Sequence, residues 1–442
     1  MTDTNTAPAS VEKSPMTKEH KKVLAGSMVG TTIEWFDFFI YAQAAGLIFA
    51  AQYFSPVASE SPTLAKILSW ATIGISFLFR PLGAIIAGHL GDRLGRKPVL
   101  VLTLLGMGAA TMLIGLLPNY EAIGLAAPIL LILLRILQGL SAGGEWGGAA
   151  MLAVEHAPHG RRGFFGSFPQ VGVPAGMALA TVFMLILSSV LSQEQFMAWG
   201  WRVPFISSII LIALGFYIRS LVEESPAFSE MQELQEKASA PLAELFKNHF
   251  PTVFKCALIF SANNVFGYFV IAFLVSYGTE YIGYERTTVL AVTLVGAIAW
   301  FFSTFIFGAF SDKVGRKRTF FWGYIALAAW AIPMWLLVDS GNLALFVFAI
   351  AILGVLLAVT YGPQSALYAE MFPLNVRLSG VSIGYALGSI MGGAFAAAIA
   401  ESLLELTGTS MAIAGYGIVM CVFSLIAVSR VPNGIQDRNL HD

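Results

Sequence analysis

The sequence predicts an all-α polytopic membrane protein whose twelve transmembrane helices form two six-helix halves, with both termini in the cytoplasm. Three observations predict it: the composition, the apolar stretches and the placement of basic residues. Of 442 residues, 57% are hydrophobic and 12% are charged, against roughly a quarter charged in soluble domains. A soluble fold cannot hide so much apolar surface, because one core stops growing at roughly 250–300 residues. The composition therefore excludes a soluble enzyme and a nucleic-acid partner.

The apolar stretches are bounded by polar, charged or Gly/Pro breaks, and each is long enough to cross a hydrocarbon core of about 30 Å. Their continuous hydrophobicity is typical of helices, whereas the strands of a membrane barrel would show short alternating segments. Spans are predicted at about 23–51, 64–90, 98–117, 122–155, 163–191, 203–222, 252–280, 287–310, 319–338, 343–369, 378–403 and 409–430.

The basic residues orient this bundle. With the amino end inside, 20 of the 25 Lys and Arg residues fall on the cytoplasmic side and three fall outside, which is the bias expected for cytoplasmic loops. The predicted parts are a cytoplasmic N-terminal tail, a first bundle, a cytoplasmic central linker with a short interfacial helix, a second bundle and a cytoplasmic C-terminal tail. Their bounds are 1–22, 23–222, 223–251, 252–430 and 431–442.

The two halves repeat each other. GHLGDRLGRKP at 88–98 recurs as GAFSDKVGRKR at 308–318, an offset of 220. Glu155 and Arg162 match Glu370 and Arg377 at an offset of 215. Parallel halves related by an axis along the membrane normal are suited to alternating access, with a substrate site between them near mid-membrane.

These motifs carry a family resemblance over nearly the whole chain beyond residue 22. The repeated G-x-x-x-D-R-x-G-R-K pattern resembles the signature of the major facilitator superfamily. IEWFDFFIYA (33–42), RILQGLSAGGEWGGAAMLAVE (135–155), WGWRVPF (199–205) and AEMFPLNVRLSG (369–380) resemble its metabolite:proton symporter family. That resemblance implies proton-driven import of solutes such as shikimate, α-ketoglutarate, citrate, proline or betaine, and SAGGEWGGAA and SFPQVG are most similar to the shikimate-type branch.

Ionisable residues inside a membrane are functional candidates, because a charge at the bilayer centre costs at least about 2.5–3.5 kcal/mol. In the first span, Glu34, Asp37 and Tyr41 follow helical spacings of three and four, which put them on one face. Two neighbouring carboxylates repel, so one of them is expected to bind a proton near neutral pH. The alternative is that Glu34 only solvates the inner end of the helix.

Arg80 lies in the second span, twelve residues before Asp92. At a helical rise of 1.5 Å per residue this places it about 18 Å along the helix, near mid-membrane. A guanidinium there can bind a substrate carboxylate through two parallel hydrogen bonds, or hold Asp37 or Glu34 in a permanent ion pair. Both interpretations stay open.

The fourth span carries Arg135, Gln138, Glu145 and Trp146. The resemblance implies that Arg135-x-x-Gln138-Gly belongs to a motif associated with proton coupling, and we expect Arg135, Gln138 and Trp146 to contact substrate as well. The alternatives are an Arg135 that extends to the outer face and a Glu145 in a permanent ion pair. Gly139, Gly143 and Gly147 recur every four residues, which lets another helix approach closely.

The loop motif at the predicted cytoplasmic ends of the helices indicates a latch that forms when that side is shut. The same positive charges also anchor the loops inside. These residues are expected to affect turnover more than substrate choice. They are Gly88, Asp92, Arg93, Gly95, Arg96, Lys97, Glu155, Arg162, Asp312, Gly315, Arg316, Lys317, Glu370 and Arg377.

Other intramembrane polar residues are weaker substrate candidates, because each can equally hold helices together. They are Gln170, Asn263, Tyr361, Gln364 and Tyr385.

No phosphate-binding G-x-x-x-x-G-K-[ST] loop or metal-ligand spacing is present, so no cofactor is expected and the proton gradient is the energy source. The predicted protein is not an enzyme but a monomeric secondary active transporter of the cell membrane, taking up a small polar organic acid with protons. One alternative is a symporter of zwitterions such as proline or betaine. Another, of a different class, is a membrane sensor that does not transport.

Overall fold

A computed structural model describes residues 17–94, 96–143, 145–158, 160–221, 244–373 and 376–438. Within these ranges every regular element is helical, as the apolar stretches predict. Most of the predicted N-terminal tail and of the central linker lies outside the described residues, and so do the last four residues of the C-terminal tail.

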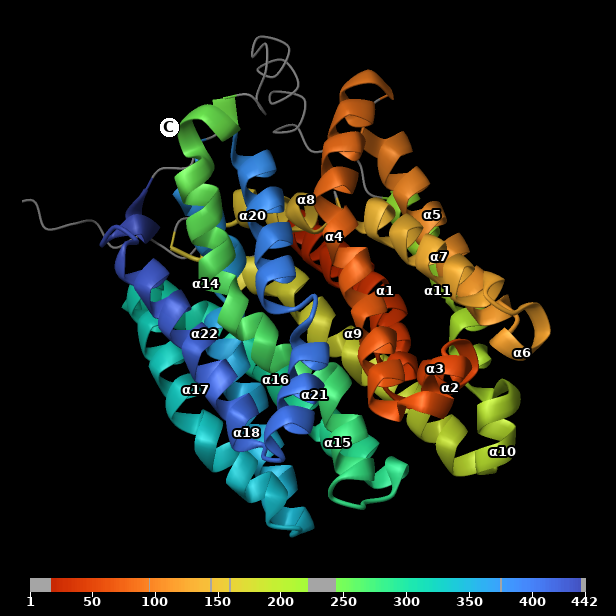
Figure 1. Cartoon of the computed structure of the whole chain (residues 1–442). Helices are drawn as coiled ribbons and strands as arrows, with labels where there is room; N and C mark the ends of the chain where they lie inside the picture. Colours follow the sequence, from red (N-terminus) through yellow and green to blue (C-terminus); the bar gives the residue numbers. More distant parts are fainter. Residues whose placement is uncertain are drawn as a thin grey trace, which may run out of the picture.

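The first half of the chain supplies the helices drawn from red to yellow-green in Figure 1. In order they are α1 (Lys18–Ala44), the π-helix Ala45–Phe49, α2 (Ala50–Tyr53), α3 (Ser55–Glu60), α4 (Pro62–Leu94), α5 (Arg96–Leu116), α6 (Tyr120–Ile123), α7 (Ala126–Ala142), α8 (Glu145–Glu155), α9 (Arg162–Val190), α10 (Gln193–Gln195), the π-helix Phe196–Gly200 and α11 (Arg202–Leu221).

The second half supplies the helices drawn from green to blue, which lie beside the first set in Figure 1. In order they are the π-helix Leu245–His249, α14 (Phe250–Tyr268), the π-helix Phe269–Phe273, α15 (Leu274–Glu280), α16 (Arg286–Val314), α17 (Arg316–Asp339), α18 (Leu343–Tyr361), α19 (Gln364–Met371), α20 (Arg377–Gly392), α21 (Ala396–Thr407), α22 (Met411–Ser429) and the 3₁₀ turn Ile435–Asp437.

Several helix contacts join the halves. α9 packs along α16 and contacts α19, and α4 packs against α20 and α21. Within each half, α4 packs on α7 and α16 packs on α18. The interface between the halves therefore runs through the middle of the bundle, where a site shared by both halves can form.

Ten helical segments among the described residues are long and apolar enough to cross a bilayer. The predicted spans 98–117 and 203–222 are not among these ten. They fall on α5, which includes the shorter apolar helix Leu102–Leu116, and on α11. A count of twelve crossings and the cytoplasmic placement of the termini stay predictions.

The sequence repeat extends to the packing of the helices. A Cβ atom on Gly139 would lie 2.2 Å from the carbonyl oxygen of Ser76, so α7 and α4 are in backbone contact there. In the second half, a Cβ atom on Gly354 would lie 2.3 Å from the carbonyl oxygen of Gly296. The two contacts are related by the same offsets, 215 and 220, as the charged motifs. The repeat therefore sets helix contacts as well as loop charges.

The glycine spacing predicted from the fourth span is confirmed. A Cβ atom on Gly143 would lie 2.0 Å from the carbonyl oxygen of Arg80, and one on Gly147 would lie 1.9 Å from the Ser382 hydroxyl. Glycine at position 143 lets α4 approach the end of α7 closely, and glycine at position 147 lets α20 approach α8 closely.

Replacing Gly143 with alanine should lower the melting temperature of the purified protein, because overpacking a tight contact costs about 1–3 kcal/mol. Gly148→Ala is the matched control, since nothing lies within 4 Å of its Cβ position. The control should melt no lower than the parent chain, because alanine favours a helix over glycine. A Gly143→Ala protein that melts like the control would contradict the contact.

Candidate functional site

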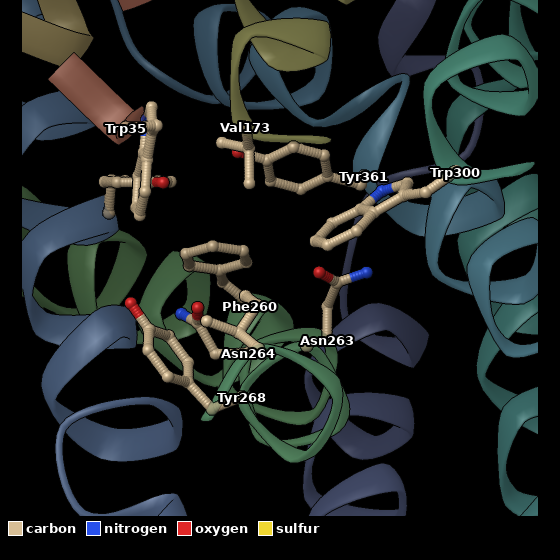
Figure 2. Close-up of a pocket in the computed structure, with 11 residues that line it drawn as sticks. Trp35, Val173, Phe260, Asn263, Asn264, Tyr268, Trp300 and Tyr361 are labelled. Carbon is tan, nitrogen blue, oxygen red and sulfur yellow. The ribbon is translucent and has the colours of Figure 1, made fainter. Parts of the chain in front are cut away.

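A small cavity lies between the halves, with room for about one water-sized molecule. A larger solute must therefore widen it to bind. Figure 2 shows Trp35 and Trp300 on different sides of it, with Asn264 and Tyr268 nearby on α14. Trp35 and Val173 come from the first half, and the other lining residues come from the second. Those are Phe260, Asn263, Asn264, Gly267, Tyr268, Ile271, Trp300, Tyr361 and Tyr385.

Unused hydrogen-bond donors collect around this cavity. Among the described residues, the indole nitrogens of Trp35 and Trp300 and the hydroxyl of Tyr268 are buried without a hydrogen-bond partner. The amide nitrogen of Gln364 and the Nε atom of Arg80 share this property, although neither residue lines the cavity. A buried donor without a partner costs about 1–3 kcal/mol. A solute with several acceptor oxygens would satisfy them.

Arg80 is not among the residues that line the cavity, but it contacts the ring of Trp35, which is. It is 4% exposed, and its guanidinium carbon lies 4.6 Å from the Phe77 ring centroid, 5.3 Å from that of Trp35 and 5.4 Å from that of Phe38. Cation–π contacts of this kind stabilise a desolvated guanidinium by about 2 kcal/mol. They leave its N–H groups available for an anion.

Trp146 and Tyr385 contact each other across the halves. Their rings stack with centroids 3.6 Å apart and planes 12° apart, and Phe260 lies 4.7 Å from Tyr385. Trp146 does not line the cavity; it supports Tyr385, which does.

Gln170 and Asn263 form hydrogen bonds within the protein. The Gln170 side chain accepts a bond from Trp146 Nε1 at 3.0 Å and donates to the Tyr361 carbonyl oxygen at 3.0 Å and to Gln364 Oε1 at 3.3 Å. The Asn263 amide donates to the Leu357 carbonyl oxygen and to the Thr360 hydroxyl. Both residues therefore join helices, as the alternative interpretation of these polar residues holds.

The two carboxylates of α1 have different surroundings. Glu34, 2% exposed, interacts electrostatically with the cavity residues Tyr361 and Tyr385. Asp37, 1% exposed, interacts with the Thr111 hydroxyl of α5. Neither carboxylate lines the cavity, but Glu34 interacts with two residues that do, whereas Asp37 interacts within the first half.

Arg135 is buried in that interior. It donates to the carbonyl oxygens of Thr72 and Ile73 and, at 2.6 Å, to Gln138 Oε1. Gln138 in turn donates to Thr111 at 2.7 Å, so a polar chain leads from Arg135 to the neighbour of Asp37.

The ring of Tyr41 completes this cluster. It lies 3.8 Å from the Arg135 guanidinium carbon, and its hydroxyl is 2.5 Å from that of Thr72. Arg135 is not among the residues that line the cavity. Glu145 is also buried, at 5% exposed, in the first turn of α8.

A layer of ion pairs joins the halves at the predicted cytoplasmic end. Asp312 accepts hydrogen bonds from the backbone N–H groups of Gly163 and Phe164 at 2.8 and 2.9 Å, where the start of α9 favours a negative charge. Arg316 pairs with Asp312 at 2.8 Å and with Glu370 at 3.3 Å. The two hydrogen bonds hold α9 of the first half against α16 of the second, and Arg316 on α17 links α16 to α19 within the second half.

Further pairs extend this layer. Arg162 lies 3.9 Å from Glu370, and Arg377 lies 3.9 Å from Glu155, each pair crossing between the halves.

Gly315 adopts a φ of 99° between α16 and α17, which favours glycine. Lys317 is half-buried in the first turn of α17.

The motif of the first half is only partly described. Gly95 lies outside the described residues. So do the surroundings of Gly88 and the side chains of Asp92, Arg93, Arg96 and Lys97.

Sequence reasoning missed an ion cluster at the opposite end. Lys66 of α4 pairs with Glu280 of α15 and lies 3.7 Å from Glu401 of α21, and Tyr281 donates to Glu401 at 3.1 Å. Glu401 is 1% exposed. A buried carboxylate in an apolar helix was the available signal, but its partner lies in the other half of the chain.

About nine-tenths of the chain is similar to proteins named as transporters. Residues 27–396 match the Major Facilitator Superfamily. The chain is 40% identical to the inner membrane metabolite transport protein YhjE of Escherichia coli (92% of this chain, 93% of the relative) and 36% identical to the shikimate transporter of that organism (91% and 92%). It is 32% identical to the proline/betaine transporter of Salmonella typhimurium (92% and 82%).

Solved structures show the same fold at low identity. The crystal structure of a D-xylose-proton symporter superimposes with a TM-score of 0.73 at 17% identity, over 95% of this chain and 99% of that one. The match of family, relatives and fold confirms the resemblance to metabolite:proton symporters drawn from the sequence. The chain is an integral membrane transport protein rather than an enzyme, and it belongs to the major facilitator superfamily.

Proposed function

We propose that the chain is a proton-coupled symporter that takes up a small polar organic acid, such as shikimate or a related hydroxylated carboxylate, across the cytoplasmic membrane. It works as a monomer and needs no cofactor, because the proton gradient drives it. The observation that carries the proposal is the donor-rich cavity beside Arg80.

The cavity is suited to a carboxylate with hydroxyl groups. Arg80 offers a planar fork of N–H donors, which binds carboxylates bidentately. The indole N–H groups of Trp35 and Trp300 and the Tyr268 hydroxyl are left to bind further oxygens. The flat rings around them can pack on the apolar face of a small ring.

Asp37 is proposed as the proton carrier. It lies in a buried cluster with Thr111, and Arg135 is joined to that cluster through Gln138. Phe38, the next residue, contacts both guanidiniums, at 5.3 Å from Arg135 and 5.4 Å from Arg80. This ring separates the proton cluster from the substrate cavity while keeping them adjacent.

Alternating access is assigned to the two ionic layers. The layer around Glu370 closes the predicted cytoplasmic end, and the layer around Lys66 closes the other end. Both layers cross between the halves, so each must break when its own end opens.

A zwitterion such as proline or betaine is the second candidate. Six aromatic residues line the cavity, namely Trp35, Phe260, Tyr268, Trp300, Tyr361 and Tyr385. Aromatic cages of this kind bind quaternary ammonium groups, and Glu34 interacts with two of the lining tyrosines. A thermal-shift screen of the purified protein against organic acids and betaines separates the two classes. Uptake of the hits into liposomes with an imposed pH gradient then separates a transporter from a sensor that does not transport.

Arg80→Gln should weaken binding of the acid by about 10- to 100-fold, because a hydrogen bond to a charged group contributes about 1.5–3 kcal/mol. Arg80→Lys should recover part of the affinity. Titration by thermal shift measures both, and the amide analogue of the acid is the control ligand. If Arg80→Gln weakened binding of the acid and of the amide equally, Arg80 would not be the group that binds the carboxylate.

Asp37→Asn should abolish uphill accumulation driven by a pH gradient, since the side chain can no longer exchange a proton. Exchange of labelled for unlabelled solute should continue. Both are measured in proteoliposomes, and undiminished uphill uptake would exclude Asp37 as the carrier.

Glu370→Gln should lower the maximal transport rate about tenfold and leave the half-saturation concentration within about twofold, because it removes a charge partner of Arg316 far from the cavity. Glu121→Gln, at an exposed site, is the control. A changed affinity with an unchanged rate would contradict the latch.

A further inference from the structure

We propose that Gln170, Trp146 and Tyr385 form an uncharged clasp that closes the cavity toward the predicted cytoplasmic end. In this proposal the three residues position the halves and set the rate of opening, and they do not bind the solute through polar groups. The inference deepens the proposed function and rests on it for the transport measurement only.

The polar atoms of Gln170 are already engaged. The side chain is fully buried. Its oxygen accepts from Trp146, and its nitrogen donates to the Tyr361 carbonyl oxygen and to Gln364. An amide nitrogen has two N–H donors, so none remains for a ligand. Because Gln170 lies on α9 and its two acceptors lie at the junction of α18 and α19, these bonds join the halves.

The ring stack joins the halves a second time. Trp146 on α8 and Tyr385 on α20 lie 3.6 Å apart, face to face. The other face of Tyr385 is covered by Phe260. A stacked ring pair of this kind holds the two helices together without any charge.

The clasp lies between the cavity and the predicted cytoplasmic layer of ion pairs. At a rise of 1.5 Å per residue, Gln170 is about 12 Å from Arg162, and Tyr385 is about 12 Å from Arg377. Trp300, on the wall of the cavity, is about 21 Å from the end of α16 at Val314. A solute that leaves toward this end must therefore pass the clasp before it reaches the ion pairs.

The test compares Gln170→Met with Gln43→Met. Gln43 is a matched control, since it is equally buried and its amide donates to Thr181 at 2.8 Å within the first half alone. Both changes are made in a chain that carries Ile271→Cys, which places a thiol on the cavity wall. A membrane-impermeant maleimide is added to either face of oriented vesicles, and the rate of labelling is measured. The chain without Ile271→Cys corrects for Cys256 and Cys421, which are both buried.

Gln170→Met should speed labelling from the predicted cytoplasmic face about five- to tenfold, because two hydrogen bonds between the halves are lost. Labelling from the other face should not rise. Gln43→Met should leave both rates within about twofold. If Gln170→Met does not fold, Trp146→Phe removes the indole donor to Gln170 and reduces the ring area stacked on Tyr385, and it should act in the same direction. In transport, the maximal rate should change while the half-saturation concentration stays within about twofold.

Two results would overturn the clasp. Unchanged labelling with solute binding weakened more than tenfold would make Gln170 a ligand. Equal acceleration by Gln43→Met would show that any lost buried bond loosens the bundle. Labelling needs no solute, so a failure to find a transported acid would defeat the proposed function while the labelling still decides on the clasp.

Discussion

The cost of placing charge in hydrocarbon governs this molecule. A charged side chain at the bilayer centre costs at least about 2.5–3.5 kcal/mol, so each buried one must be compensated. Arg135 is compensated by two carbonyl oxygens and Gln138, whereas Arg80 has three aromatic rings. Arg135 also contacts the rings of Phe38 and Tyr41, so the difference lies in its hydrogen bonds. That difference supports the proposed ligand-binding role of Arg80 and the proposed internal role of Arg135.

The bundle is layered along its axis. Ion pairs that cross between the halves lie at both ends, and a neutral contact of rings and amides lies between the cavity and one of these ends. Charged pairs near the ends can be rehydrated when they separate, whereas groups nearer the centre have no water to replace a lost partner. Neutral contacts at the centre are therefore cheaper to break on every cycle.

Patterns local in sequence predicted most of the fold, because helix length, glycine spacing and loop charge are local properties. The repeat even relates two helix contacts: the contact of Gly139 with Ser76 in the first half corresponds to that of Gly354 with Gly296 in the second. Contacts between distant segments could not be predicted. The face of α1 that carries Glu34 and Asp37 gave no sign that Glu34 would interact with tyrosines of the second half. Nor could an apolar helix show that Gln170 has every polar atom engaged.

The central claim is that solute and proton cross together, and the pH outside vesicles tests it most directly. Adding the solute to proteoliposomes with equal pH on both sides, and following external pH with an impermeant dye, records proton movement in the absence of an imposed driving force. Symport predicts that the medium becomes more alkaline as the solute enters. Entry of the solute with no change in external pH would contradict the coupling.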